Sequence, residues 1–367
     1  MPSRRQFICQ SSAAIALLPL AACGRADAMD YQAAATKLRT DLSKNPNMQE
    51  MLRFATLAAN GHNSQPWRFS INGSSASIIP DLSRRTPVVD PDDHHLFISL
   101  GCAAENLLLA GAAHGRPGEL LFLNTAGGRI DIGLGRGKAE KSALYSAIPK
   151  RQTTRSIYQG GRISVDDLAD LEAAANVEGV SIHIITDDRQ REAVLDQVIS
   201  ANTQQMGNPD FIKEMKQWVR FNPDEALAKR DGLFSLSTGE PIAPTFIGRA
   251  LFSQFLDVDA ENKKYAAQIR SSPVIAVFTG DRANKDNWIK VGRSFQRFAL
   301  QATALGLRHA HINQPIEVTS ARQQFASWLG TPGSRPDLVI RLGYAPALPM
   351  SLRRPVTDVL IPWEISR

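Results

Sequence analysis

The pattern of apolar and polar positions in the first part of the chain predicts two helices followed by a β-hairpin. Residues 30–42 and 47–59 carry apolar side chains at helical spacing, and Asn60–Gly61 then supplies a typical helix stop. Residues 67–81 alternate around Asn72–Gly73, a strong hairpin signal. Trp67 and Phe69 lie two residues apart and are expected on one buried side of the first strand.

An internal repeat organises the rest of the chain. Gly101–Gly115 (GCAAENLLLAGAAHG) and Gly292–Gly306 (GRSFQRFALQATALG) both predict an apolar-faced helix that ends in a glycine cap. Each follows a strand-like segment, residues 76–81 in one case and 272–280 in the other. Two copies at half-chain spacing predict a duplicated α+β unit.

The second half adds further elements and one irregular region. Residues 164–176 predict a helix with Ser164 as its N-cap, and residues 180–186, 273–280 and 337–345 predict buried strands. Residues 204–256 mix short amphipathic helices with Gly and Pro breaks, which favours a lid or insertion. We therefore divide the chain into an N-terminal signal (1–22), a tether with the first helix (23–46), a first unit (47–138) and a second unit (139–367).

The first residues resemble an export signal. Arg4 and Arg5 precede a short apolar run, as in twin-arginine signals, and Leu20-Ala21-Ala22 precedes Cys23, as in a bacterial lipoprotein box. A transmembrane anchor is the alternative, but the apolar run is well short of the roughly 20 residues that a span needs. We expect a lipid on Cys23 that holds the protein to a membrane on the periplasmic face, inner or outer.

Composition and cysteine content exclude two other classes. A formal net charge of +6 without an aromatic-interleaved basic stripe does not favour nucleic-acid binding. Cys102 is the one cysteine left beyond residue 23, so we expect no disulfide framework, and its place in an apolar helix predicts a buried side chain.

Two arginine-containing stretches are candidates for anion binding. KRQTTRSIY contains Arg151, Thr153 and Arg155, and SLRRPV contains Arg353 and Arg354. If the first stretch opens a helix, both its arginines share one side beside free N–H groups, which suits a phosphate. Taken singly, each stretch is better explained as an ordinary solvated basic face.

Other polar clusters carry weaker signals. The cluster DPDDHH (residues 90–95) and His309 with His311 could bind a metal, but a turn with helix-capping acids and a strand connection account for them better, and we predict no metal. Residues 133–138 (GLGRGK) do not open a Rossmann unit, so we reject a phosphate loop there.

Four stretches together resemble the flavin-dependent nitroreductase family: ATLAANGHNSQPWRFSI, GCAAENLLLAGAAHG, RQTTRSIY and LVIRLGYAPALPMSLRRPVTDVL. The arginine stretch follows the NGHNSQPW stretch here, whereas ordinary members have it first. This order resembles the tandem, Acg-type branch, in which one chain is similar to a fused dimer. The resemblance implies an α+β, nitroreductase-like fold with two pseudo-symmetric units and a monomer that serves as a pseudo-dimer.

The resemblance also implies FMN and a single site composed from both halves. It assigns the FMN phosphate to Arg151, Thr153, Arg155, Arg353 and Arg354. It assigns the edge of the ring or the ribityl chain to Asn60, Gly61, His62, Asn63 and Gln65, with His62 equally able to lie free of the cofactor. Pro66 is expected to restrict Gln65 to extended geometry.

The implied function is flavin-mediated two-electron reduction of nitro compounds, quinones or similar small-molecule acceptors, with no side chain required as acid or base. The electron donor stays open, because NAD(P)H is not expected outside the cytoplasm. One alternative is a lipid-anchored protein that binds or sequesters flavin under its lid with little turnover. Another is an interaction module without flavin.

Overall fold

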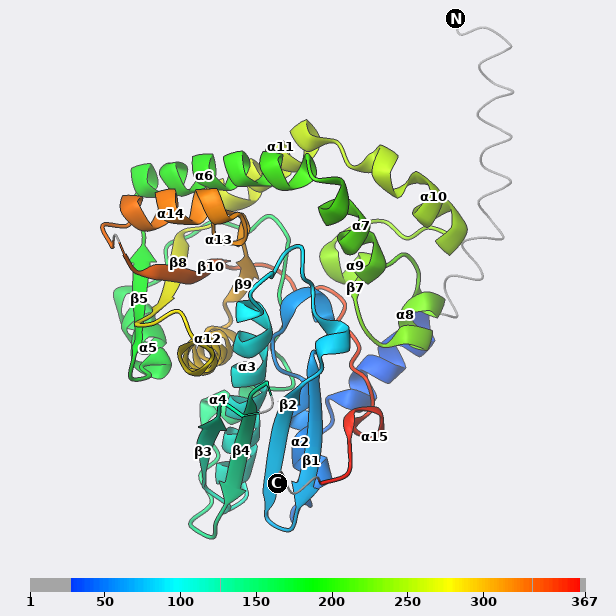
Figure 1. Cartoon of the computed structure of the whole chain (residues 1–367), viewed down its shortest axis with the longest axis vertical. Coiled ribbons are helices and arrows are strands. Elements are labelled where there is room, and N and C mark those ends of the chain that lie inside the picture. The colour runs from blue at the N-terminus through cyan, green and yellow to red at the C-terminus, as the bar shows by residue number, and fades with distance from the viewer. Residues whose placement is uncertain (1–27, 126, 332, 364–367) are drawn as a thin grey trace, which may run out of the picture.

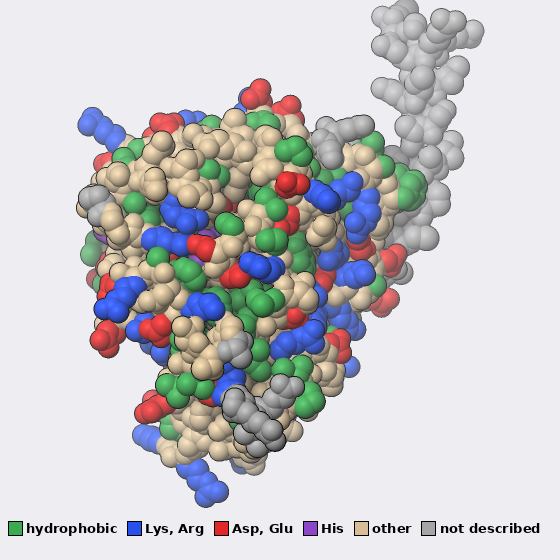
Figure 2. Space-filling model, viewed as in Figure 1, with side chains coloured by type: hydrophobic (Ala, Val, Ile, Leu, Met, Phe, Trp, Pro, Cys, Tyr) green, Lys and Arg blue, Asp and Glu red, His purple; other side chains and the backbone are tan. Residues whose placement is uncertain are grey.

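The computed structural model describes residues 28–125, 127–331 and 333–363. The predicted signal and Cys23 lie outside the described residues. The described part begins with a helix at residues 28–38. The chain then passes through residues 39–47 into the first unit. Figure 2 shows basic and acidic side chains interspersed over one face of the molecule.

The first unit is a helix, a hairpin, a long helix and a second hairpin. Its elements are α2 (Met48–Thr56), η1 (Gly61–Asn63), β1 (Trp67–Asn72), β2 (Ser75–Pro80), η2 (Leu82–Arg84), α3 (His94–Ala113), β3 (Gly118–Leu123) and β4 (Arg129–Leu134). The predicted hairpin is confirmed: Asn72 pairs with Ser75, and Gly73 turns the chain at φ +59°. Trp67 and Phe69 are fully buried, as predicted.

The second unit repeats this plan with additions. Its elements are α5 (Val165–Ala175), β5 (Val180–Ile185), β8 (Val274–Gly280), α12 (Lys285–Ala304), β9 (Arg308–His311), α13 (Gln314–Glu317), α14 (Thr319–Trp328) and β10 (Arg335–Gly343), and the short α4 (Ala143–Ala147) precedes them. Ser164 caps α5 by accepting the N–H of Asp167, as predicted.

The two four-stranded antiparallel sheets of the described residues share one topology. Their strand orders are β1-β2-β4-β3 and β5-β8-β10-β9. Matching by chain order pairs α2 with α5, β1 with β5, β2 with β8, α3 with α12, β3 with β9 and β4 with β10. The predicted duplication is therefore visible in strand order as well as in the repeated helices.

The repeated helices α3 and α12 pack on each other at the centre of the molecule (Figure 1). A Cβ on Gly101 would lie 2.1 Å from the carbonyl oxygen of Ile289, and one on Gly292 would lie 2.0 Å from that of Ile98. Both residue pairs are related by the same offset (292 − 101 and 289 − 98). The two helices thus cross about a pseudo-two-fold axis, and glycine at each crossing position permits the close approach.

Helix α3 is the one helix of the described part that is long and apolar enough to cross a membrane, and 89% of that window is buried inside the protein. This burial is typical of a core helix. Both repeated helices begin seven residues before the predicted glycine, at His94 and Lys285.

The second unit carries a large insertion between β5 and β8. It contains α6 (Asp188–Met206), α7 (Pro209–Trp218), β6 (Val219–Arg220), α8 (Pro223–Lys229), β7 (Leu233–Phe234), α9 (Ser235–Thr238), α10 (Thr245–Phe255) and α11 (Val258–Arg270). Helices α6 and α11 pack against the second sheet, whereas α7 to α10 extend away from it toward the first unit (Figure 1). We call residues 207–257 the lid, close to the predicted 204–256.

The C-terminal segment returns to the first unit. Leu360 bridges Phe69 of β1, and α15 (Val356–Val359) packs on α2. The last residues of the predicted second unit therefore contact the first sheet, and the chain closes around the space between the two units.

Candidate functional site

A pocket lies between the two units and the lid. Its walls enclose about 1120 Å³ of space, part of which is open to solvent. They come from both units, the lid, the first helix and the C-terminal segment. The pocket is thus composite, in the sense the sequence predicted.

Helix α3 forms one wall at helical spacing. His95, Ile98, Ser99 and Cys102 all line the pocket, which places one stripe of the helix against it. Phe295 of α12 lines it from the other unit. Cys102 is buried as predicted, and burial raises the pKa of its thiol.

The NGHNSQ loop has an unusual backbone. His62, Asn63 and Gln65 have φ values of 49°, 53° and 54°, in the left-handed region that side chains other than glycine rarely adopt. Asn60 Oδ1 accepts the N–H of Gln65 across the turn at 2.8 Å. The expectation that Pro66 keeps Gln65 extended is therefore wrong. Clustered strained residues are typical of functional sites, where the surrounding structure holds them in place.

Asn60, Gly61, His62 and Asn63 line the pocket, but Gln65 does not. Gln65 is fully buried; its Nε2 donates to the Arg230 carbonyl at 2.9 Å, and its Oε1 accepts the Arg354 N–H at 2.8 Å. Gln65 thus joins the loop to the lid and to the C-terminal segment through these two hydrogen bonds. The sequence had placed it at the ring edge instead.

Asn63 does both. Its Nδ2 donates to the carbonyls of Gly232 and Leu352 at 3.0 and 3.2 Å, while its buried Oδ1 has no partner among the described residues. The lid is therefore docked on the strained loop.

The first arginine stretch is extended rather than helical. It follows the end of α4, and Thr153 bridges His309 of β9, so the predicted helix start is wrong. Alternation along an extended chain still places Arg151, Thr153 and Arg155 on one side, and all three line the pocket.

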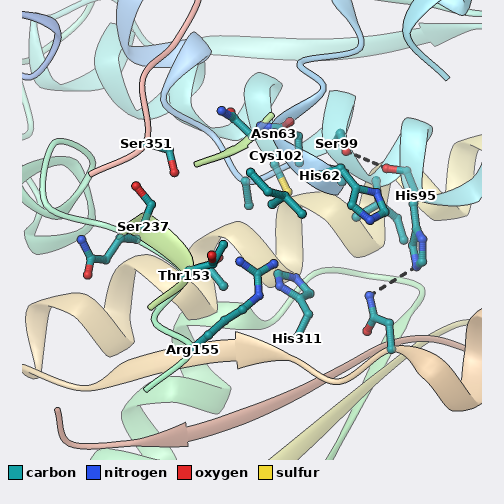
Figure 3. A pocket seen from close by; sticks show the side chains of 18 of the residues that line it. His62, Asn63, His95, Ser99, Cys102, Thr153, Arg155, Ser237, His311 and Ser351 are labelled. Carbon is teal, nitrogen blue, oxygen red and sulfur yellow. Dashed lines mark hydrogen bonds between the residues drawn. The ribbon is translucent and has the colours of Figure 1, made fainter. Parts of the chain in front are cut away.

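Arg151 has unused hydrogen-bonding capacity. Its Nη2 donates to the Leu57 carbonyl, but its buried Nε and Nη1 have no partner among the described residues. Burial lowers the pKa of Arg151 to about 10, so it remains charged at neutral pH. Arg155 has no hydrogen bond or ion pair from its guanidinium to the described residues. In Figure 3 the Arg155 side chain lies beside that of His311.

Arg353 lines the pocket and also donates hydrogen bonds to carbonyl groups at the C-terminal end of α2. Its Nε and Nη2 donate to the carbonyls of Thr56 and Ala58, and its charge stays beside the pocket. Arg39, which no motif marked, also lines the pocket and donates to the Ser351 carbonyl at 2.8 Å.

Arg354 does not line the pocket, contrary to the predicted pairing with Arg353. Its Nη1 lies 3.8 Å from Asp81 Oδ2, and its Nη2 donates to the Asp358 carbonyl. Adjacent residues on an extended segment point to opposite sides, which explains why one of the pair is directed away.

The electrostatics of the pocket favour an anion. Among the described lining residues Glu317 is the only carboxylic acid, and burial raises its pKa to about 7. Burial and the charge of Arg155 lower the pKa of His62 to about 4 and that of His311 to about 3, so both imidazoles are neutral at pH 7. The arginines therefore dominate the charge of the pocket.

Several lining residues had no signal in the sequence. Among them are Arg39, Glu317, Thr86 and Val89. Each reaches the pocket through a long-range contact, which no local motif encodes.

The residues of the DPDDHH cluster begin α3. The Asp90 carboxylate accepts the N–H groups of His95 and Leu96, which confirms the capping interpretation. Potential ligand atoms of Asp90, His94 and His95 also lie within 4.8 Å of one another. Because both Asp90 oxygens already accept backbone N–H groups, helix capping accounts for this cluster.

No family model matches the chain. It is 26% identical over 344 residues to "Putative NAD(P)H nitroreductase Rv3131" of Mycobacterium tuberculosis, covering 88% of this chain and 93% of that protein. It is 22% identical over 347 residues to "Putative NAD(P)H nitroreductase acg" of the same species, covering 88% and 96%. The chain is thus a distant homologue of these proteins across both units, and the predicted α+β, nitroreductase-like fold is confirmed.

The likeness to solved structures is more distant. A nitroreductase with bound FMN from Bacteroides fragilis aligns at 15% identity and a TM-score of 0.35, over 56% of this chain and 89% of that one. The FMN-dependent nitroreductase NfnB from Mycobacterium smegmatis, in complex with NADPH, aligns at 13% identity and a TM-score of 0.38, over 55% and 87%.

Proposed function

We propose that this chain is an FMN-dependent oxidoreductase, similar to nitroreductases, that reduces nitro compounds, quinones or related small acceptors. The observation that carries the proposal is the unpartnered, buried guanidinium edge of Arg151 inside a composite, arginine-rich pocket. Buried polar groups in proteins are nearly always hydrogen-bonded, so such an edge indicates a ligand that supplies acceptors.

The pocket residues fit a phosphate-bearing ligand with a large ring. Arg151, Arg155 and Thr153 offer free guanidinium and hydroxyl groups for a phosphate, and Arg39 and Arg353 add positive charge. The polar side of a ring system finds donors and acceptors in Asn60 and Asn63, and Gly61 allows close backbone approach, because a Cβ there would meet nothing within 4 Å.

FMN, when bound, supplies two-electron transfer between a donor and an acceptor. The chain's own residues bind the anion, orient the ring and limit the access of water. The lid contributes Leu233 and Phe234 to the wall, and the neutral His62 and His311 offer hydrogen bonds without adding charge.

We further propose that the chain is exported by the twin-arginine route and held to a membrane by a lipid on Cys23. Twin-arginine export carries folded proteins, which suits a cofactor inserted in the cytoplasm. The two relatives carry the name "Putative NAD(P)H nitroreductase". An exported protein needs a donor available outside the cytoplasm, and a membrane hydroquinone meets this requirement.

An absorbance spectrum of the chain without residues 1–22 tests the proposal. We expect a flavin spectrum on purification or after addition of FMN, with weaker retention of the flavin in Arg155→Ala and unchanged retention in Arg354→Ala, whose side chain lies outside the pocket. A chain that binds no FMN under either condition would refute the proposal. Bound flavin that dithionite reduces, but that passes no electrons to nitro compounds or quinones, would favour sequestration over catalysis.

A further inference from the structure

The lid carries an uncharged, apolar outer face. Phe246 is 75% exposed, and Ile242 and Ile247 are 43% and 38% exposed; Ala250, one turn after Phe246, is exposed as well. We call these four residues the apolar lid face. Exposed bulky apolar side chains gathered in one short segment mark an interaction site more often than isolated ones do.

Two neighbouring residues, Gly248 and Arg249, tie this segment to the rest of the lid. Arg249 forms an ion pair with Glu225 of α8 at 2.5 Å. Gly248 is buried against Phe221, where a Cβ would lie 2.4 Å from the ring. Helix α10 is thus attached to the lid, and its sequence contains a single charged residue, Arg249, whose half-exposed side chain is paired with Glu225. Figure 2 shows apolar side chains exposed at this corner of the molecule.

The start of the described chain lies at the same corner. Tyr31 and Ala35 of the first helix pack with Ala226 of α8 and Phe234 of β7. Helix α8 is joined to the start of α10 by Asn222, whose Nδ2 donates to the Ala243 carbonyl and to Thr245 Oγ1. The apolar lid face is therefore one short helix away from the first helix of the chain.

The length of chain before this helix limits how far a lipid anchor could lie from the lid. Four residues lie between Cys23 and Ala28, so the five steps from Cys23 to Ala28 span at most about 18 Å when fully extended. A lipid on Cys23 would hold this corner of the protein at the surface of the bilayer. We infer that the apolar lid face is a membrane-contact surface, in which Phe246, Ile247 and Ile242 enter the headgroup boundary of the membrane that bears the anchor.

The size and chemistry of the face suit this partner. Interfacial helices bury apolar side chains roughly 5–10 Å into the headgroup boundary. A second apolar contact beside the anchor fixes the orientation of the protein on the bilayer. It also turns the lid side of the pocket, lined by Leu233 and Phe234, toward the bilayer. This consequence, which favours donors dissolved in the membrane, rests on the proposed function.

A label at position 246 tests the contact directly. The chain from residue 24 onward carries an N-terminal oligohistidine in place of the lipid and is bound to phosphatidylethanolamine–phosphatidylglycerol vesicles containing a nickel-chelating lipid. Removing residues 1–23 leaves every described contact intact. Cys102 is 1% exposed, so Phe246→Cys provides the accessible thiol for an environment-sensitive nitrobenzoxadiazole label. The matched control is Val165→Cys, 81% exposed on α5 at the opposite side of the molecule (Figure 1).

We expect the label at 246 to shift to the blue and brighten on vesicles, and to be quenched by spin-labelled lipid, while the label at 165 stays unchanged. Ile247→Cys repeats the measurement, so that one misfolded variant does not decide the result. Unchanged emission at 246 and 247 on vesicles shown by flotation to carry the protein would overturn the inference. Equal changes at 165 and 246, or a change at 246 that follows protein concentration without vesicles, as a second copy would produce, would also overturn it. The inference rests on the proposed anchor at Cys23, but neither label depends on bound flavin, so this outcome is distinguishable from a failure of the proposed FMN chemistry.

Discussion

The crossing of α3 and α12 offers the sharpest test of the fused-pair architecture. In Gly101→Ala and Gly292→Ala the new Cβ would lie 2.1 and 2.0 Å from backbone carbonyl oxygens. Ordinary van der Waals contact begins at 3.4 Å, so the helices must separate by about 1.4 Å. The contacting atoms are backbone atoms of Ile289 and Ile98, so no side-chain rotation can relieve either clash.

The expected cost follows from two opposing effects. Overpacking a tight interface costs about 3 kcal/mol, and replacing glycine by alanine inside a helix returns about 1 kcal/mol. Each variant should therefore lose about 2 kcal/mol of unfolding free energy in urea titrations. If one separation relieves both clashes, the double variant should lose well under the sum of about 4 kcal/mol, which is the signature of coupled sites.

The control is Gly133→Ala, since its Cβ would meet only Ser75 Oγ at 3.9 Å. It should change the unfolding free energy by less than about 1 kcal/mol. Ile98, whose carbonyl meets Gly292, also lines the pocket, so Gly292→Ala should weaken FMN binding too. Neutral single variants, or a double variant that loses the full sum, would refute the pseudo-symmetric crossing as the reason for these glycines.

Three further predictions concern the pocket. Arg155→Ala should weaken FMN binding about tenfold to a hundredfold, the loss expected for hydrogen bonds from a charged group, while Arg354→Ala binds as the parent does in fluorescence titrations. Folding holds Glu317 in its neutral form, with a folded pKa of about 7 above the ordinary 4.5. Its contribution to stability is thus full below pH 4.5 and declines as the pH rises through 7. Glu317→Gln should flatten the pH dependence of the urea midpoint between pH 5 and 8, and an unchanged slope would contradict this. Asp231→Asn removes the ion pair that joins the lid to Arg84 of the first unit and the pair with Arg220 within the lid. Limited proteolysis should then cut residues 207–257 faster and FMN should dissociate faster; equal rates would show that these pairs do not hold the lid.

Local patterns predicted the elements well, because hairpins and caps depend on neighbouring residues. Asn72–Gly73 turns the first hairpin and Ser164 caps α5, both as their sequence neighbours indicated. The matching Gly101–Gly115 and Gly292–Gly306 segments also predicted the central helix pair, because two copies of one helix are expected to occupy equivalent places in the two units.

The conformation of the site depended on contacts that local patterns do not contain. Arg151 to Arg155 are extended because Thr153 pairs with β9, more than 150 residues later in the chain. Gln65 adopts a left-handed conformation that its neighbour Pro66 does not favour, and hydrogen bonds from the lid and the C-terminal segment hold it there. Arg39 reaches the pocket through the packing of the first helix, for which no motif exists.

The pseudo-symmetry also defines a second position, related to the pocket by the same offset, whose residues differ from those of the pocket. The offset that relates Gly101 to Gly292 carries the pocket-lining stripe of α3 onto α12. There His95, Ser99 and Cys102 are replaced by Asp286, Lys290 and Arg293.

These replacements are charged and already paired. Lys290 lies 3.1 Å from Asp286, and Arg293 forms an ion pair with Glu105 at 2.8 Å. The connection from α5 to β5 is residues 176–179, whereas the one from α2 to β1, residues 57–66, holds the strained NGHNSQ loop. The second position therefore lacks both the neutral wall and the loop, and the insertion that forms the lid docks on the loop that remains. Among the described residues, the pocket therefore joins the strained loop of the first unit to the arginine stretch near the start of the second unit.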